Sequence, residues 1–145
     1  MGMFRYAVGL ISADGTREEQ VRPWVDTGAM YCQFPDSLLR GLGYEPTSER
    51  RLTMADGSTV SRPFGAVTMR IGDEALPVHC VFDTTNRAIM RLGVIALEAF
   101  SVMANPVNKT LEPTFGMMLT LYPSDAVGPR TVLQGRADAG LPMRR

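Results

Sequence analysis

Short runs of alternating apolar and polar residues, broken by glycine-containing turns, dominate the first half of the chain. Residues 3–12 (MFRYAVGLIS) alternate loosely and are rich in residues that favour strands. The dipeptide Asp14-Gly15 then supplies the backbone angles of a hairpin turn, and the chain returns through residues 20–25 as a second strand. This strand leads into an Asp-Thr-Gly-Ala turn at 26–29. The pattern therefore predicts a β-hairpin whose second strand ends at an acidic residue.

Two further hairpins are expected between residues 51 and 82. The first, over 51–63, has Asp-Gly at its tip at residues 56 and 57. The second begins at residue 64 and turns at Gly72-Asp73. Both segments carry strand-forming residues on either side of the turn, so the middle of the chain is predicted to be antiparallel β-structure.

Helical spacing of apolar residues occurs in two short segments. In residues 35–43 (PDSLLRGLG) the leucines share one face, the proline is tolerated in a first turn and the last glycine can end the helix. In residues 93–100 (GVIALEAF), Val94, Leu97 and Phe100 form one apolar face. We therefore predict two short helices.

Together these elements predict an all-β fold, mainly antiparallel, with two short helices. One or two late strands are expected at 110–122, whereas the stretch beyond Pro123 has no sustained period and several chain breakers. We therefore assign residues 1–122 to one folded domain and residues 123–145 to a C-terminal tail. The 14 glycines and 10 prolines in 145 residues favour many short elements joined by turns.

Composition excludes several functional classes. The chain has 15 basic and 15 acidic side chains, so its formal net charge is zero, whereas nucleic-acid binders usually carry a basic excess. No apolar run approaches the roughly 18 residues that a membrane span needs. Cys32 and Cys80 fit no metal-ligand pattern, and the first residues do not resemble a signal peptide. We expect a cytoplasmic protein with reduced thiols, no metal or other cofactor, and no nucleic-acid or membrane partner.

The clearest local signal for chemistry is the segment WVDTGA at residues 24–29. Two apolar residues end a strand, and a carboxylate then follows in a turn of small residues. The same letters also fit an ordinary turn, in which Thr27 caps the strand end and Gly28 supplies the backbone angle. The motif alone leaves both interpretations open.

In its context this segment resembles the active-site loop of retropepsin-like aspartic proteases. In those proteins the loop is followed by a strand, a hairpin flap, another hairpin, an apolar-apolar-glycine signature, a short helix and a final strand. The corresponding segments here are residues 30–34, the hairpin with Asp56-Gly57 at its tip, the hairpin that turns at Gly72-Asp73, residues 90–93 (MRLG), residues 94–100 and the segment from Val107 onward. The stretch 92–113 is similar to the C-terminal part of small prokaryotic members, and the resemblance covers roughly residues 3–113.

The resemblance implies a closed β-barrel that is one half of an acid protease and assembles as a two-fold homodimer. Asp26 would be the catalytic acid, the Thr27 hydroxyl would bond across the interface, and Gly28 would let the backbone approach the carboxylates. Residues 52–62 would form a flap over an extended peptide or protein substrate. The implied substrate-binding residues are Trp24, Ala29, Met30, Ala55, Asp56, Gly57 and Leu92.

The sequence departs from the family pattern in two places. Met30 and Tyr31 stand where retroviral enzymes have acidic residues that help to hold the substrate backbone. Arg91 interrupts the apolar pair before Gly93. We expect the first departure to alter substrate contacts and the second to disturb the packing beneath the loop.

The chemistry that the motif suggests needs two copies of the chain. Peptide hydrolysis without a metal or a covalent nucleophile requires a base that activates water and an acid that protonates the carbonyl oxygen or the leaving nitrogen. Two carboxylates a few ångströms apart can do both, because they cannot both ionise and therefore share a proton. The chain contains one such loop, so two copies must meet on a two-fold axis. The predicted function is an aspartic endopeptidase, a hydrolase that uses two Asp26 carboxylates in a homodimer.

Other functions stay open on the sequence. A dimer with this fold could bind a peptide in its groove without cutting it, since a fold does not determine a function. The chain could also be a small β scaffold, acting as a subunit or a toxin–antitoxin-style partner, with a coincidental motif. A thiolate pair of Cys32 and His79 is the weakest candidate, because no oxyanion loop or orienting acid is evident.

Overall fold

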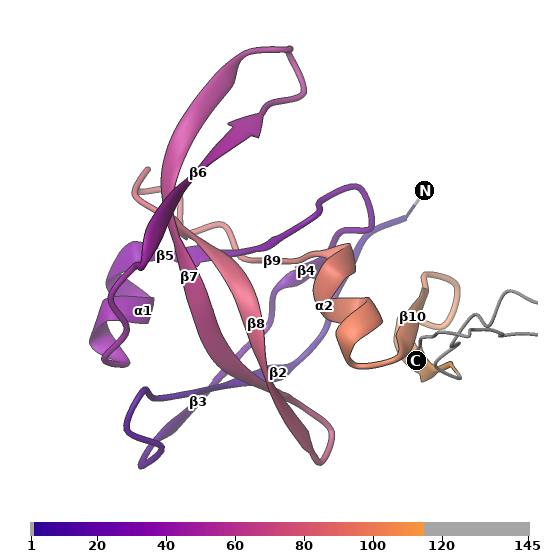
Figure 1. The fold of residues 1–145 in the computed structure, drawn as a ribbon. Helices are drawn as coiled ribbons and strands as arrows, with labels where there is room; N and C mark the ends of the chain where they lie inside the picture. Colours follow the sequence, from indigo (N-terminus) through magenta and orange to yellow (C-terminus); the bar gives the residue numbers. More distant parts are fainter. Residues whose placement is uncertain (1, 115–145) are drawn as a thin grey trace, which may run out of the picture. The chain divides into compact units, whose positions relative to one another are not determined.

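Strands predominate in the structure, a computed structural model that describes residues 2–114 of the chain (Figure 1). The strands in this range are β1 (Phe4–Arg5), β2 (Val8–Ile11), β3 (Glu18–Val21), β4 (Trp24–Val25), β5 (Cys32–Pro35), β6 (Ser48–Thr53), β7 (Thr59–Ile71), β8 (Glu74–Asp83), β9 (Arg91–Leu92), β10 (Val102–Asn105) and β11 (Thr110–Pro113). The helices in this range are α1 (Asp36–Gly41) and α2 (Val94–Ala99). The mainly-β class with two short helices is confirmed.

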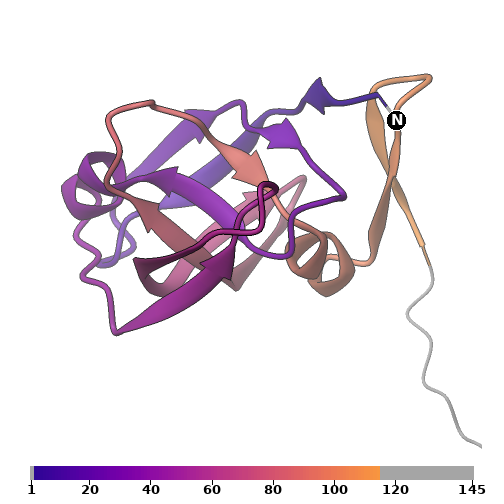
Figure 2. The same cartoon turned by 90° about the horizontal axis from the view of Figure 1, so that it is seen from above.

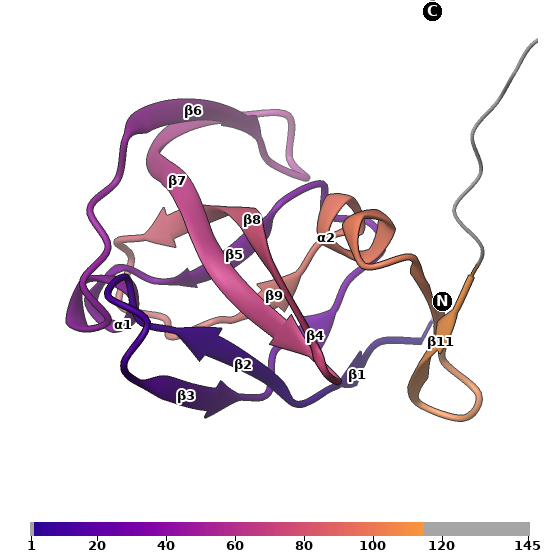
Figure 3. The ribbon, with the colours of Figure 1, turned by 60° about the horizontal axis from the view of Figure 1, so that its bottom comes forward.

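Most of the strands belong to one curled sheet. Its order is β1-β4-β9-β5-β8-β7-β2-β3, with β6 attached to β7, while β10 and β11 form a separate antiparallel pair. Figure 3 shows the sheet curling back on itself, with β1 and β3 as its edge strands. Most neighbours are antiparallel, as predicted, but β4 pairs in parallel with β9 and β5 in parallel with β8. These two parallel pairs bring segments that are far apart in the sequence to one place.

The structure divides two strands that the sequence predicts as continuous. The segment 3–12 becomes β1 and β2 because the chain changes partner: β1 pairs with β4, whereas β2 pairs with β3 and β7. The returning segment 20–25 becomes β3 and β4, with Pro23 between them. Proline has no N–H to donate to a ladder, so a break at this residue is expected physically. The predicted turn is present, with Gly15 at φ +77°.

Both later hairpins are confirmed, but they share one strand. β7 runs without interruption from Thr59 to Ile71, pairing with β6 along its first half and with β8 and β2 along its second. Gly57 and Gly72, at the two tips, have φ of +87° and +63°, which glycine adopts without steric cost. Figure 1 shows the β6–β7 hairpin projecting beyond the rest of the sheet. We call residues 48–63 the arm.

The two helices lie at opposite sides of the curled sheet, as the view from above shows (Figure 2). α1 begins at Asp36, one residue after the proline that the sequence places in its first turn. Gly43, with φ +91°, follows its end. α2 occupies the predicted segment, and Leu97 and Phe100 are buried there. The two predicted helices are therefore confirmed.

The C-terminal part of the domain differs from the prediction in one element. β10 is not predicted by the sequence, and it pairs with β11 in register from Val102–Pro113 to Asn105–Thr110. The late strand expected at 110–122 is present as β11. Residues 115–122 and the predicted tail, 123–145, lie outside the described residues.

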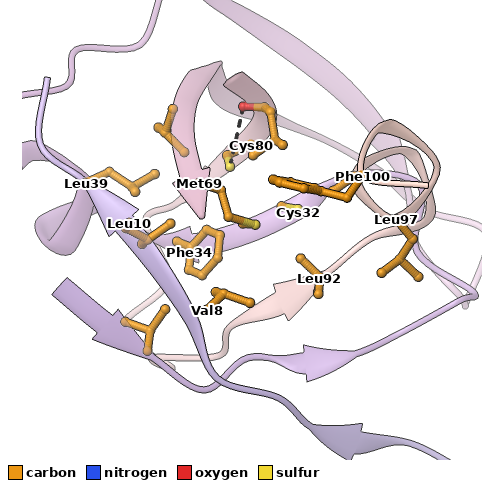
Figure 4. Packing of buried hydrophobic residues seen from close by; sticks show 14 of the residues in the cluster. Val8, Leu10, Cys32, Phe34, Leu39, Met69, Cys80, Leu92, Leu97 and Phe100 are labelled. Carbon is orange, nitrogen blue, oxygen red and sulfur yellow. Dashed lines mark hydrogen bonds between the residues drawn. The ribbon is translucent and has the colours of Figure 1, made fainter. Parts of the chain in front are cut away.

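A single apolar core fills the space inside the curled sheet. Strands β2, β5, β7, β8 and β9 and both helices contribute to it. Figure 4 labels Val8, Leu10, Cys32, Phe34, Leu39, Met69, Cys80, Leu92, Leu97 and Phe100. Complete burial of an aliphatic or aromatic side chain stabilises the folded state by roughly 1.5–3 kcal/mol. This core is what holds the short strands β4 and β9 in position.

Candidate active site

The parallel pairing of β4 with β9 fixes where the acidic turn begins. Trp24 lies opposite Arg91, and Val25 lies opposite Leu92. Val25 and Leu92 are both buried in the core. The Asp26 N–H extends this pairing by donating to the Leu92 carbonyl at 3.0 Å. The main chain of β9 therefore positions the first residue of the turn.

The turn itself orients the Asp26 carboxylate. The Gly28 N–H donates to Oδ1 of Asp26 at 3.0 Å, and the Ala29 N–H donates to the Asp26 carbonyl at 3.1 Å. A Cβ atom at Gly28 would lie 3.3 Å from Oδ1, which is tight. Thr27 is half-buried beside Asp26, whose side chain is 24% exposed. The result is an oriented carboxylate that solvent or a ligand can reach.

The beginning of α2 holds the next part of the loop. The Val94 N–H donates to the Ala29 carbonyl at 2.8 Å, and the Ile95 N–H donates to the Met30 carbonyl at 3.1 Å. These are N–H groups of the first helical turn, which have no partner within the helix itself. The loop and the helix therefore satisfy each other's backbone groups.

Gly93, just before α2, permits this close approach. A Cβ atom at this position would lie 2.5 Å from both the backbone carbon and the carbonyl oxygen of Tyr31, and 2.8 Å from the Met30 carbonyl oxygen. Real Cβ atoms do not come this close to backbone atoms. The sequence identifies this residue only as the last letter of the MRLG segment, and its role depends on contacts that the sequence does not reveal.

The base of the arm is attached to the same loop by aromatic contacts. The Arg50 guanidinium lies 4.3 Å from the centre of the Phe64 ring and 5.4 Å from that of Tyr31. Its Nη1 donates to the Tyr31 hydroxyl at 3.3 Å. The Tyr31 and Phe64 rings meet edge to face at 4.8 Å. Cation–π and edge-to-face contacts of this kind each contribute roughly 0.5–1.5 kcal/mol.

A chain of polar side chains runs from Asp26 into the sheet. Nε of Arg91 lies 3.4 Å from Oδ2 of Asp26, and Nη1 of Arg91 donates to Oε1 of Gln33 at 3.3 Å. Nε2 of Gln33 in turn donates to Oδ2 of Asp83 at 3.1 Å. The disturbed packing expected from Arg91 is not found, because Leu92 fills the buried position. Arg91 instead lies partly exposed beside Asp26, a role that the sequence does not predict.

Asp83, the last residue in this series of side-chain contacts, is a buried anion. It is 6% exposed, and its Oδ1 accepts hydrogen bonds from the N–H and the hydroxyl of Thr85 at 3.0 and 2.8 Å. Burial alone would raise the pKa of Asp83, but the hydrogen bonds from Thr85 and Gln33 and the charge of Arg62 outweigh it. The pKa of Asp83 therefore lies below its ordinary value of 3.8.

Replacing Asp83 by Asn should make the protein less stable and less sensitive to acid. Because the folded protein holds the pKa of Asp83 below its unfolded value, ionised Asp83 stabilises the fold above about pH 4, and this contribution is lost as the pH falls through the lowered pKa. Asp83→Asn should lower the free energy of unfolding by about 1–2 kcal/mol at pH 7 and by less at pH 3. Urea denaturation at both pH values measures the difference. An equal loss at pH 7 and pH 3 would contradict the assignment.

The structure brings together only some of the predicted substrate-binding residues. Trp24, Ala29 and Met30 lie within four residues of Asp26 along the chain. Met30 is 57% exposed, and the Trp24 ring is covered on one side by the Arg5 guanidinium at 4.9 Å. Leu92 has no exposed surface and packs beneath the loop. The remaining candidates, Ala55, Asp56 and Gly57, are exposed at the tip of the arm.

The alternative thiolate site does not form. Cys32 and Cys80 are free, buried and opposite each other on β5 and β8, and burial raises the pKa of the Cys80 thiol. His79 is exposed on the other face of β8, where its ring stacks on Phe64 at 5.6 Å. Within residues 2–114, no cluster of three His, Cys, Asp or Glu side chains is arranged to hold a metal ion.

Comparison with known protein families gives a match over most of the chain. A family model described as "Aspartyl protease" matches residues 12–117 of the chain. No curated protein matches it. Neither of the helices between residues 2 and 114 has the length and apolar character needed to cross a membrane.

Among solved structures, a retropepsin-like aspartic protease from Rickettsia conorii is 18% identical, with a TM-score of 0.50 and coverage of 76% of this chain and 91% of that one. The protease of simian foamy virus is 12% identical, with a TM-score of 0.44 and coverage of 62% and 87%. A Legionella pneumophila protein of unknown function is 13% identical, with a TM-score of 0.45 and coverage of 72% and 92%. The likeness to the Rickettsia structure is one of fold.

Proposed function

The chain belongs to the aspartyl protease family, and from this premise we propose that it is an aspartic endopeptidase whose active site is completed by a second copy of the chain. The observation that carries the proposal is the orientation of Asp26. Its carboxylate is partly exposed at the end of β4, with Oδ1 held by the Gly28 N–H. A general base must be fixed in this way and still be reachable by water and substrate.

In the proposed reaction the two Asp26 side chains share one proton. The ionised carboxylate takes a proton from a water molecule, whose oxygen attacks the carbonyl carbon of the peptide bond. The protonated carboxyl gives its proton to the carbonyl oxygen, which forms a gem-diol. The nitrogen then accepts the proton that the other carboxylate took from water, the C–N bond breaks, and a diol hydroxyl returns its proton to the first carboxylate, so the pair again shares one proton. Thr27 and Gly28 would keep the paired loops rigid, and the arm would cover the bound peptide and exclude water.

The surface around Asp26 supports assembly with a second copy. Trp24, Met30 and Ile95 carry 36%, 57% and 38% of their surface exposed around the loop. Large apolar side chains gathered at one place usually mark an interaction site. A two-fold dimer through this face would bury them and bring the two carboxylates together.

The dimeric site predicts that activity depends on protein concentration. Below the dissociation constant of the dimer, each tenfold dilution should lower the hydrolysis rate per chain about tenfold, because the dimer fraction falls in proportion to concentration. The assay measures cleavage of a mixture of extended peptides across a dilution series, with sedimentation at the same concentrations. A constant rate per chain in a strictly monomeric sample would refute the dimer.

A second candidate function is favoured by the Arg91–Asp26 contact. In a catalytic pair the two carboxylates reduce their repulsion by sharing a proton. Here the positive charge of Arg91 lies 3.4 Å from Oδ2 of Asp26 and offers another way to compensate the negative charge. A dimer with both ion pairs intact would be a peptide-binding module that does not cut. Hydrolysis by the parent protein separates the two candidates.

A cytoplasmic location is part of the same proposal. Cys32 and Cys80 lie opposite each other on neighbouring strands, and both thiols are free. Free thiols are the usual state in reducing compartments, which supports the cytoplasm over an oxidising environment.

A further inference from the structure

A pocket of about 100 Å³ lies between Arg91 and the arm. Its walls come from the inner face of the β6–β7 hairpin, from the ends of β5 and β8, and from the segment that leads to β9. The lining residues are Gln33, Leu52, Met54, Val60, Arg62, Val81, Asp83, Thr85, Arg87, Ile89 and Arg91. Because Arg91 is in contact with Asp26, this pocket begins beside the proposed catalytic carboxylate.

The charged residues of the pocket make it positive. Its lining has three arginines, Arg62, Arg87 and Arg91, and one acid, Asp83; Arg91 also pairs with Asp26, so three positive charges stand against two negative ones. The Asp83 oxygens already accept three hydrogen bonds, two from Thr85 and one from Gln33. The apolar part of the lining lowers the local dielectric, so each charge acts more strongly than it would in water. The pocket is therefore suited to an anionic group.

The arginines of the pocket still have donors to offer. A guanidinium carries five N–H groups, and the contacts of Arg91 with Asp26 and Gln33 are made through Nε and Nη1. Gln33 fixes the plane of that guanidinium, and Asp83 fixes Gln33. Arg62 bonds through Nη1 to the Ser61 carbonyl at 3.1 Å. Arg87 is exposed at the rim. A planar guanidinium held in this way is preorganised for bidentate binding of a carboxylate.

We propose that this pocket binds an acidic side chain, glutamate or aspartate, of the peptide substrate close to Asp26. Arg62, Arg87 and Arg91 would be its specificity-determining residues. The proposal rests on the proposed function in one respect only, that an extended peptide lies along Asp26 beneath the arm. The proposal assigns the substrate class: peptides that carry a glutamate or aspartate close to the peptide bond that is cleaved.

The test uses a synthetic peptide mixture with every residue represented at each position. The full-length parent is assayed for cleavage of this mixture. In a second assay, an immobilised Asp26→Asn variant selects peptides by binding. Mass spectrometry identifies the cleaved and the bound peptides. One position should favour Glu or Asp over Gln or Asn by about tenfold, the difference expected for a charge-assisted hydrogen bond. Equal recovery of acids and amides at every position would overturn the proposal.

A charge reversal provides the matched control. Arg87→Glu removes a pocket charge without touching Asp26 or Gln33, and it should reduce the preference for acids at least about threefold and increase recovery of Lys and Arg at that position. Arg22→Glu makes the same change at an exposed arginine outside the pocket and should keep the parental preference. An unchanged preference in Arg87→Glu, with its thermal unfolding like that of the parent, would overturn the proposal.

The two proposals can fail separately. If acidic peptides are selected but none is cleaved, the proposal of an acid-binding pocket stands and the proposal of a peptidase is refuted. If peptides are cleaved with no preference between Glu and Gln, the proposal of a peptidase stands and the proposal of an acid-binding pocket is refuted.

Discussion

Replacing Asp26 by Asn should lower peptide hydrolysis by at least about 10²–10⁴-fold, the usual contribution of a positioned acid or base. An amide cannot take a proton from water, so both halves of the proposed pair lose their function at once. The turn should survive, because an Asn oxygen can still accept the hydrogen bond that Gly28 donates to Oδ1 at 3.0 Å. The variant should therefore remain folded and dimeric in sedimentation while its cleavage rate falls.

A matched control for this variant is Asp73→Asn. Asp73 is exposed in the turn between β7 and β8, so the same change in charge there should leave hydrolysis at the parental rate. Undiminished activity in Asp26→Asn would remove Asp26 from the mechanism.

A transition-state mimic extends the same experiment. A statine-type inhibitor carries a hydroxyl in place of the attacked carbonyl, so an enzyme of this class should bind it far more tightly than a substrate peptide. Asp26→Asn should abolish most of that gain. If the parent binds the mimic no better than an ordinary peptide and cuts nothing, the non-catalytic binding module is the better account.

Replacing Gly93 by Ala should lower the free energy of unfolding by about 1–3 kcal/mol, the range for an overpacked interior, and reduce hydrolysis as well. The backbone of Gly93, with φ −92° and ψ 170°, suits any residue, so the effect is steric. The new methyl would lie 2.5 Å from the Tyr31 carbonyl group, and either the loop after Asp26 or the start of α2 must move. Urea denaturation and a cleavage assay on the same sample measure both losses.

Gly41→Ala is the control for this variant. Gly41 is the last residue of α1, and a Cβ atom there would meet no atom within 4 Å. Since glycine is unfavourable in a helix, this change should be neutral or stabilise the protein by up to about 1 kcal/mol. A Gly93→Ala variant as stable as Gly41→Ala would show that the loop does not need the close approach.

The parts of the fold that could be predicted are those that local turn chemistry determines. Gly15, Gly57 and Gly72 all have positive φ at hairpin tips that the sequence locates from Asp-Gly and Gly-Asp pairs. The break at Pro23 and the strand β10 were not predicted. At Pro23 the missing N–H coincides with a change of pairing partner from β2 to β1, and only the second of these lies outside the local sequence. β10 is defined by its pairing with β11 rather than by its own pattern.

The site was predictable only where its residues are consecutive. Asp26 and Gly28 belong to one motif, and the turn they form matches it. Gln33, Asp83 and Arg91 are separated by 50 or more positions in each hydrogen-bonded pair. The parallel pairing of β5 with β8 and the antiparallel pairing of β5 with β9, where Gln33 lies opposite Arg91, bring them together. Such pairings depend on the packing of the whole core, which no local pattern encodes.

The continuity of β7 has a mechanical consequence for the arm. The same strand forms one side of the arm, carries Arg62 into the charged pocket, and continues through the core to Ile71. Arg50, on the opposite strand, is held by the rings of Tyr31 and Phe64, so the base of the arm has little freedom of its own. Because its base is held in this way, we expect any bending of the arm to be centred near Phe64. Arg62 is two residues from Phe64 on the same strand, so a movement of the arm toward a bound peptide would also shift Arg62 within the pocket.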